Sequence, residues 1–377
     1  MNQSVSRPLE GLRVIELARV LAGPWCGQLL ADLGAAVIKI ERPEVGDDTR
    51  HWGPPFVTGA AGEDLGAAYY HSCNRGKRSI AIDIATGAGQ TALRELLADA
   101  DVVIENYKVG GLAKYGLDPA RLRADFPQLI VCSVTGFGQT GPYAHRAGYD
   151  YIVQAMSGFM SLTGEPDGPP QKAGIAYADI FTGLYSTVAI LAALRRRDVM
   201  GAGAHIDMAL LDSQVAVLAN QAANYLASGV VPKRMGSGHA NVVPYQVFAT
   251  ADGQLVIAVG NDSQYRKLCT ILGMPEWGTD PRFATNAARL ENRSILIPML
   301  AAKIAAWDAQ TLSLALEAEG VPAGPINDLA GVFADPQVVA RGMRFRPEGA
   351  AIDAVASPIV IDGERMIAAR GAPPLGE

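Results

Sequence analysis

The chain has 377 residues, with 32 Lys and Arg against 38 Asp and Glu and a formal net charge of −6. Its 49% hydrophobic and 19% charged residues are typical of a globular protein, which excludes a disordered chain. A mildly acidic chain without a basic block also disfavours nucleic-acid binding. The 41 Gly and 23 Pro residues exceed the usual share and predict many turns and loops.

The first third of the chain alternates short apolar runs with helical patterns. Strand–helix–strand units of about thirty residues imply a parallel sheet, so an α/β fold is expected. The predicted strands span residues 12–17, 36–40, 79–84, 101–105 and 129–134. The predicted helices span residues 24–33, 87–97 and 119–126.

Two loops rich in glycine and proline follow, at 136–148 and 164–174. The first precedes a helix that begins near Tyr149, and the second precedes an apolar helix over about 180–194. A strand at 205–208 then leads into a helix that continues to about Leu226. We therefore assign residues 1–200 to a large domain and residues 201–228 to a linker helix.

The pattern changes at Gly229. A hairpin with an Asp-Gly turn is expected over 242–259, and three helices follow it before residue 320. These elements predict a smaller α+β domain over 229–325. Residues 330–377 are assigned to the large domain, because the tail strands at 343–346 and 358–361 can return to the first sheet.

The cysteines and the apolar segments bear on the compartment. Cys26, Cys73, Cys132 and Cys269 form no CxxC pair and no histidine has zinc-site spacing, so reduced thiols and no metal are expected. Residues 1–9 lack an apolar signal segment, and Leu184–Leu194 is too short to span a bilayer. The sequence predicts a cytoplasmic protein without a membrane partner.

The turn after the first strand argues against a nicotinamide cofactor. Residues 17–24 read LARVLAGP and lack the GxGxxG pattern of a dinucleotide site. Glu41 nevertheless ends the second strand, where a ribose-binding acid would lie, and Arg42 after it can hold a phosphate. A nucleotide-like ligand with an extra phosphate stays open, whereas no GxSxG motif supports serine hydrolysis.

Asp179, at the start of the apolar helix, is the leading catalytic candidate. Two compatible interpretations stay open: a helix N-cap, since Asp accepts backbone N–H bonds there, and a nucleophile in a site that excludes water. The loop with Gly236, Gly238 and His239 is either a domain linker or a flexible cover over a reacting group.

Several segments together resemble the class III CoA-transferases, the CaiB/BaiF-type family that includes formyl-CoA transferase. The resemblance covers almost the whole chain and is carried by LEGLRVIEL (9–17), AGP (22–24), LGAAVIKIE (33–41), NRGKRS (74–79), ENY (105–107), GFGQTGP (136–142) and TGE (163–165). It implies an interlocked homodimer with a Rossmann-like, CoA-binding large domain. It also implies acyl-CoA and carboxylate substrates, with no metal and no nicotinamide.

The resemblance assigns roles by position. Asp179 would attack the donor acyl-CoA to give a mixed anhydride and then an aspartyl-CoA thioester. CoA binding falls to Arg42, Ile82, Asn106, Tyr107, Lys114, Ala147 and Tyr149, and substrate or cover-loop roles to Leu21, Gly236, Gly238 and His239. Formyl-CoA transferase has Gln at the position of Leu21, lysines at those of Ala85 and Ala147, and Arg at that of Lys114, which disfavours formyl or oxalyl substrates here.

Two alternatives to a transferase stay open. An α-methylacyl-CoA racemase of the same superfamily is disfavoured because Tyr149 lies where the racemases have a catalytic His. A non-catalytic CoA-binding protein is disfavoured by the presence of Asp179. Within the transferases, residues 235–245 and 260–262 resemble the succinyl-CoA:dicarboxylate (glutarate) branch, with His239, Arg19 or Arg146 as candidates to bind the free carboxylate.

Overall fold

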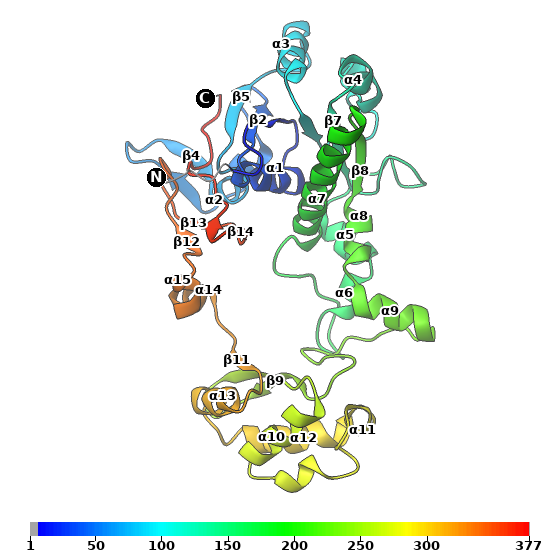
Figure 1. Ribbon diagram of the computed structural model, residues 1–377, viewed down its shortest axis with the longest axis vertical. Coiled ribbons are helices and arrows are strands. Elements are labelled where there is room, and N and C mark those ends of the chain that lie inside the picture. The colour runs from blue at the N-terminus through cyan, green and yellow to red at the C-terminus, as the bar shows by residue number, and fades with distance from the viewer. Residues whose placement is uncertain (1–6, 377) are drawn as a thin grey trace. The chain divides into compact units, whose positions relative to one another are not determined.

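The computed structural model describes residues 7–376, which divide into two compact units (Figure 1). Unit 1 comprises residues 7–159, 172–218 and 335–376, and unit 2 comprises residues 160–171 and 219–334. Unit 1 is therefore assembled from three separate stretches of the chain.

A parallel sheet of six strands forms the centre of unit 1, in the order β5-β2-β1-β6-β7-β8. This confirms the α/β prediction. The strands β2 and β5 are added on one side of β1, and the later strands β6, β7 and β8 on its other side, so the direction of strand addition changes between β1 and β6. Ligands bind at such a switch point, beyond the carboxyl ends of the strands. The strands are β1 (Arg13–Glu16), β2 (Ala36–Glu41), β5 (Arg78–Ala81), β6 (Val102–Glu105), β7 (Ile130–Thr135) and β8 (His205–Ala209).

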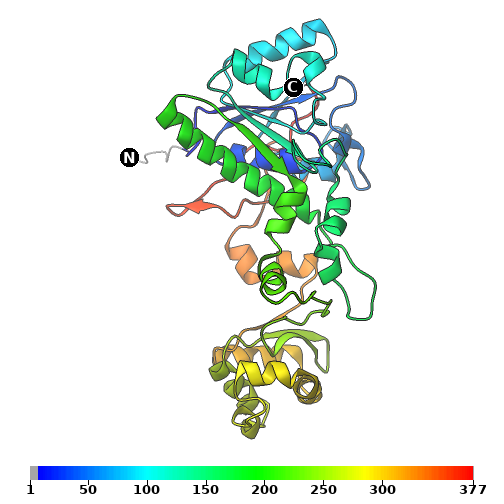
Figure 2. The ribbon, with the colours of Figure 1, turned by 90° about the vertical axis from the view of Figure 1, so that its right-hand side faces the viewer.

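Helices cover both faces of this sheet, which is why inner strands such as β6 and β7 are mostly apolar and buried, whereas the edge strands β5 and β8 carry polar residues. α1 (Ala22–Asp32) and α7 (Tyr177–Met200) lie on one face, and α3 (Gly87–Ala98) and α4 (Pro119–Asp125) on the other (Figure 2). Neighbouring strand residues alternate between the two cores: Val14 packs with the α1 and α7 side, and Ile15 with the α3 and α4 side.

Helix α7 is longer than the sequence predicts. Its 24 residues end at Met200, and Gly201 after it, with a φ of +70°, closes the helix in the left-handed conformation. By length and composition alone α7 could cross a membrane, contrary to the expectation from its apolar run, although 44% of its most apolar 18-residue stretch is buried inside the fold. The core helix of a soluble protein can have the same length and composition, so the absence of a membrane partner stays a prediction.

The rest of unit 1 consists of short elements around the sheet. The tail strands were expected to be able to return to the large sheet, and this is wrong: they pair with one another in two separate two-stranded hairpins. The short elements are η1 (Asp48–His51), β3 (Phe56–Thr58), β4 (Asp64–Ala67), α2 (Ala68–His71), η2 (Ala113–Tyr115), α5 (Asp150–Met156), α8 (Leu210–Ala216), α15 (Pro336–Ala340), β12 (Arg344–Phe345), β13 (Ala354–Val355), β14 (Val360–Ile361) and β15 (Glu364–Arg365).

Unit 2 has an antiparallel sheet of three strands, in the order β11-β10-β9, packed on helices around one apolar core. Its strands are β9 (Tyr245–Ala249), β10 (Gln254–Ala258) and β11 (Ala323–Pro325). Its helical elements are α9 (Ala219–Ser228), α10 (Asp262–Ile271), η3 (Pro275–Gly278), α11 (Asn286–Glu291), α12 (Arg293–Ile304), α13 (Ala309–Ala318) and α14 (Leu329–Ala334); α6 (Phe159–Leu162) starts one residue before this unit.

The predicted strand at 205–208 is present as β8 of the large sheet. The helix expected after it, to about Leu226, is not continuous and divides into α8 of unit 1 and α9 of unit 2. The break lies at Ala219, whose φ of +45° is incompatible with a continuous right-handed helix.

Candidate active site

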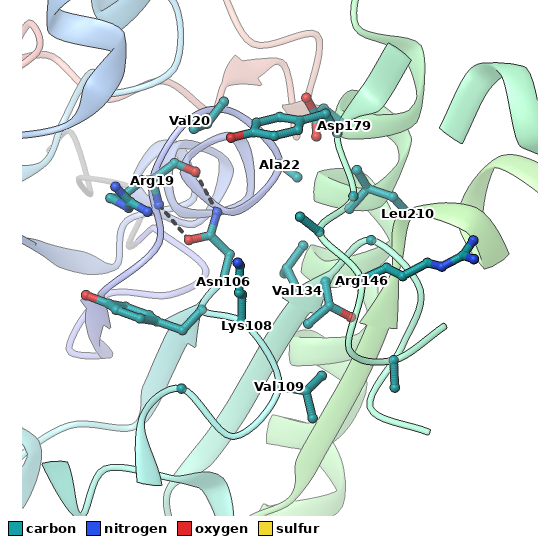
Figure 3. Close-up of a pocket in the computed structure, with 18 of the residues that line it drawn as sticks. Arg19, Val20, Ala22, Asn106, Lys108, Val109, Val134, Arg146, Asp179 and Leu210 are labelled. Carbon is teal, nitrogen blue, oxygen red and sulfur yellow. Dashed lines mark hydrogen bonds between the residues drawn. The ribbon is translucent and has the colours of Figure 1, made fainter. Parts of the chain in front are cut away.

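A cavity of about 590 Å³ lies beyond the carboxyl ends of β1, β6 and β7, beside the switch point of the sheet (Figure 3). Its walls are the segments that follow these strands, together with residues 144–150, Asp179 on α7 and Leu210 on α8. The sequence-predicted residues Leu21, Asn106, Tyr107, Lys114, Ala147, Tyr149 and Asp179 all line it. Parallel strands bring these distant segments together because their carboxyl ends share one edge.

A second cavity of about 250 Å³ lies beside the first and includes Arg42 and Ile82 in its lining. Arg19, Tyr107 and Tyr115 line both cavities. An elongated ligand can therefore extend from one into the other. Gly236, Gly238 and His239 line neither cavity, since they belong to unit 2, where the amide of Gly236 donates to Gly164 O at 3.1 Å.

Asp179 lies in the first turn of α7, but it is not the N-cap. The helix begins at Tyr177, its N-cap is Ala176, and no side chain of this cap accepts a bond. Asp150 of α5 performs this function instead: its Oδ1 accepts from Ala178 N at 2.8 Å and from Asp179 N at 3.4 Å. The N-cap interpretation of Asp179 is therefore wrong, and within residues 7–376 its own carboxylate has no hydrogen-bond partner.

The surroundings of Asp179 change its protonation. Burial, and after it the negative charge of Asp150, raises the pKa of Asp179 to about 7. Near neutral pH the carboxyl is thus divided between its acid and its ionised form. Its ionised form is more basic than an ordinary aspartate, which favours nucleophilic attack.

The turn after β1 is held in a strained conformation at the wall of the cavity. Val20 has a φ of +73°, which costs a β-branched residue about 1–2 kcal/mol. Asn106 binds both backbone groups of Arg19, the residue before Val20: its Oδ1 accepts from Arg19 N at 3.0 Å and its Nδ2 donates to Arg19 O at 2.7 Å (Figure 3). Asn106 therefore positions this wall, and its predicted contact with CoA stays a prediction.

Cations are gathered around the larger cavity. Arg19 pairs with Asp48 at 2.7 Å, and the Arg146 guanidinium lies 4.0 Å from the centre of the Tyr143 ring. Lys108, which the sequence analysis did not single out, lines the cavity and extends toward Asn106 in Figure 3. Its position directly after Asn106 and Tyr107 on the β6 loop was the available signal. Such cations suit phosphates and carboxylates.

Two loops touch backbone to backbone at the cavity wall. A Cβ on Gly148 would lie 2.4 Å from the Cα of Gly136, closer than any real Cβ contact. Only glycine therefore allows this crossing.

At the wall of the second cavity, charged side chains are buried as a paired network. Lys39 Nζ lies 2.9 Å from both Glu16 Oε1 and Asp47 Oδ2, and all three side chains are fully buried or nearly so. Burial is the largest single influence and acts to raise the pKa of Asp47, but the charge and hydrogen bond of Lys39, together with the hydrogen bonds from Thr49, lower this pKa below its usual range. Asp47 also accepts from Val20 N at 3.3 Å, so the network supports the strained turn.

No group of three or more His, Cys, Asp or Glu side chains among residues 7–376 could hold a metal ion. That the protein uses no metal stays a prediction.

Comparisons with known proteins bear on the family. Residues 9–377 match CoA-transferase family III. The succinate–glutarate CoA-transferase of Agrobacterium fabrum is 58% identical over 98% of this chain and 93% of its own, and the human succinyl-CoA:glutarate CoA-transferase is 43% identical over 98% and 84%. The crystal structure of a CaiB/BaiF family protein from Brucella suis superposes with a TM-score of 0.87 at 57% identity, over 98% of this chain and 96% of its own. The chain therefore belongs to CoA-transferase family III and is an enzyme of the CoA-transferase class.

Proposed function

We propose that this enzyme transfers CoA from succinyl-CoA to a short dicarboxylic acid such as glutarate, with Asp179 as the nucleophile. The observation that carries the nucleophile is its carboxylate, which lines the larger cavity without a hydrogen-bond partner in residues 7–376 and has a pKa of about 7. The proposed substrates follow the names of the Agrobacterium and human relatives, at 58% and 43% identity.

The proposed reaction has four acyl transfers. An oxygen of Asp179 attacks the thioester carbon of the donor, and CoA leaves as a thiolate, which gives a mixed anhydride. The thiolate attacks the carbonyl carbon that Asp179 contributes, which releases the donor acid and leaves CoA on Asp179 as a thioester. The acceptor carboxylate displaces this thiolate to form a second anhydride. The thiolate then attacks the acceptor carbon, giving acceptor-CoA and free Asp179.

The protein contributes positioning and the exclusion of water, because each step replaces one activated acyl group by another. CoA would extend across both cavities, which share Arg19, Tyr107 and Tyr115. Arg42 would meet the adenosine-phosphate end and Lys114 a phosphate. Asn106, Tyr107, Ile82, Ala147 and Tyr149 would line the path, with Leu21 and the loop of Gly236, Gly238 and His239 toward the substrate.

The assembly and surroundings belong to the same proposal: an interlocked, cytoplasmic homodimer without metal, nicotinamide, nucleic-acid or membrane partner. Exposed apolar side chains on α7 support a partner copy, since Leu184, Tyr185 and Val188 are 40%, 41% and 63% exposed. Light scattering after size-exclusion chromatography without detergent should give twice the mass of the chain. A monomer that retains turnover would contradict the dimer.

The decisive experiment is intact-mass spectrometry of the enzyme after incubation with succinyl-CoA. We expect a CoA adduct that peptide mapping places on Asp179, and that glutarate discharges as glutaryl-CoA. Asp179→Ala should lose the adduct and at least about 10³-fold of the turnover, as nucleophile removal does in other enzymes. Asp212→Asn, an exposed acid in the first turn of α8, is the matched control and should behave like the wild type.

Two results would overturn the proposal. Turnover that survives in Asp179→Ala would exclude the nucleophile. Exchange of the α-proton of a 2-methylacyl-CoA in D2O without any acceptor acid would favour a racemase. A panel of acceptor acids separates the substrate from the mechanism: transfer to carnitine or aryl acids alone, still through Asp179, would contradict the dicarboxylate only.

A further inference from the structure

We propose that Asp150 and Gln154 of α5 form a positioning pair that holds Asp179 in place and sets the pH range in which it reacts. The inference rests on the proposed function, because it assigns a role relative to the nucleophile. It concerns two residues that the sequence analysis gave no role in catalysis.

Gln154 fixes the orientation of Asp150. Its side chain is fully buried, and its Nε2 donates to Asp150 Oδ2 at 2.7 Å. Its Oε1 accepts from Ala173 N at 2.9 Å, and Nε2 also lies 3.4 Å from Ile175 O. One carboxamide therefore links Asp150 to the segment that leads into α7.

Asp150 in turn fixes the start of α7. Its second oxygen accepts from Ala178 N at 2.8 Å and from Asp179 N at 3.4 Å, while Ala176 at the N-cap offers no side-chain acceptor. The acceptor that a helix start requires comes from another helix, 28 residues earlier in the chain. Because one of these amides belongs to Asp179, the pair fixes the backbone position from which the Asp179 side chain extends.

The same carboxylate acts through its charge. Asp150 and Asp179 both line the larger cavity, and within residues 7–376 no cation pairs with Asp150. Tyr69 of α2 also faces Asp179, but burial, followed by the charge of Asp179, raises its pKa, so it stays neutral near pH 7. The cations that line the cavity are Arg19, Lys108, Lys114 and Arg146. After burial, the charge that shifts the pKa of Asp179 is that of Asp150.

The sign of the effect follows. Removal of the negative charge at 150 lowers the pKa of Asp179, so more of the nucleophile is ionised in mildly acidic solution. The acid limb of kcat/KM against pH, which reports the free enzyme, must then move to lower pH. Loss of a merely structural contact would reduce kcat without moving this limb.

The first variant is Asp150→Asn. Its oxygen can still accept from Ala178 N, but its amide would face the Nε2 donor of Gln154, so one hydrogen bond is lost together with the charge. We expect kcat at pH 8 to fall about 10- to 100-fold because the nucleophile is misplaced. We also expect the acid limb to move to lower pH by more than the error of replicate titrations.

The double variant Asp150→Asn/Gln154→Glu restores the hydrogen bond between the two side chains and places a carboxylate at 154, although the 3.4 Å contact of Gln154 Nε2 with Ile175 O is lost. The amide of Asn at 150 can donate to the carboxylate of Glu at 154, which can still accept from Ala173 N. Relative to the single variant, kcat at pH 8 should recover several-fold. Because the charge now lies one side chain further from Asp179, the acid limb should lie between those of the single variant and the wild type.

Asp212→Asn is again the control and should leave both kcat and the acid limb unchanged, since Asp212 lines neither cavity. An acid limb that stays in place in both Asp150 variants, or a double variant no faster than the single one, would overturn the inference. The CoA adduct on Asp179 keeps this test separate from the proposed function: adduct formation with an unmoved limb rejects only the positioning pair. Turnover without any adduct in the wild type rejects the proposed function itself.

Discussion

Asp47 and Asp179 are both carboxyl groups of unit 1 that burial affects, yet their pKa values move in opposite directions. At the wall of the second cavity, burial acts to raise the pKa of Asp47, but Lys39 and the hydrogen bonds from Thr49 together lower it. In the larger cavity, burial and Asp150 raise the pKa of Asp179 to about 7. Burial acts in the same direction on both groups, so the sign is decided by the partner. The paired group is held as a permanent ion, whereas the unpartnered group keeps a reactive, titratable carboxylate.

The network around Lys39 has a structural role, whereas the site around Asp179 has a chemical one. The network around Lys39 satisfies its charges, holds the strained turn at Val20 through Asp47, and changes little with pH. The site around Asp179 leaves one charge unsatisfied, which costs stability and provides reactivity. The following substitutions test this difference, from the largest expected effect to the smallest.

Lys39→Met should destabilise the fold most. The substitution keeps the volume but leaves Glu16 and Asp47 buried without their shared cation, which costs about 3–5 kcal/mol. Urea unfolding at pH 7 measures the free energy of unfolding. Lys303→Met on α12, an exposed lysine, is the control and should stay within about 0.5 kcal/mol of the wild type. A Lys39→Met protein as stable as this control would show that the network carries no such energy.

Asp179→Asn should stabilise the protein, but only above mildly acidic pH. A carboxyl whose pKa rises from 3.8 to about 7 on folding contributes stability below pH 3.8 that is lost as the pH rises through about 7. At 1.36 kcal/mol per pH unit the loss has an upper bound of about 4 kcal/mol. The variant lacks this loss, so urea unfolding should show its advantage at pH 8 and little of it near pH 4. An equal difference at both pH values would contradict the raised pKa.

Gly148→Ala should disturb the cavity wall. The new methyl would lie 2.4 Å from Gly136 Cα, so the two loops must separate, at a cost of about 1–3 kcal/mol for overpacking. The KM for acyl-CoA should rise several-fold, which steady-state kinetics measures. Gly174→Ala is the matched control, because a Cβ there meets nothing within 4 Å. A Gly148→Ala enzyme that binds acyl-CoA like this control would refute the close crossing.

Arg42→Ala should have the smallest effect. The guanidinium is only loosely paired, with 3.9 Å from its Nη2 to Asp48 Oδ1, and its side chain is 57% exposed. Loss of an exposed phosphate contact is worth about 1 kcal/mol, so the KM for acyl-CoA should rise roughly fivefold. The same substrate without its 3′-phosphate should bind both enzymes alike. If Arg42→Ala raised the KM equally for acyl-CoA with and without the 3′-phosphate, Arg42 would not be the residue that binds this phosphate.

Much of the fold was predictable because each strand of the large sheet carries its own signal. Residues 36–40 and 129–134 are apolar runs buried on both faces, and the structure has β2 and β7 there. The tail was not predictable in this way. Strands of two residues, such as β14, carry almost no pattern, so the sequence does not show which strand each one pairs with.

The cavity residues were predictable in part for a similar reason. Asn106 and Tyr107 directly follow a predicted strand, and the carboxyl ends of parallel strands meet at one edge. The cap by Asp150 was not visible, because it depends on a hydrogen bond to Ala178, on a different helix. The buried Lys39 had a weak signal, as a charged residue within an apolar strand, but its partners lie on other segments of the chain.

The division of unit 1 into three stretches has a consequence for its completion during synthesis at the ribosome. The sheet is complete once residue 209 has been made, yet Asp32 on α1 is buried against a much later segment, where its Oδ1 accepts from Ala368 N at 2.8 Å. All of residues 219–334 are synthesised in between. Until the tail has been made, the amide of Ala368 is missing and Asp32 depends on Arg75, whose Nη2 lies 2.6 Å from Asp32 Oδ2. A chain that stops before residue 368 therefore has a first unit in which this buried carboxylate lacks its last hydrogen bond.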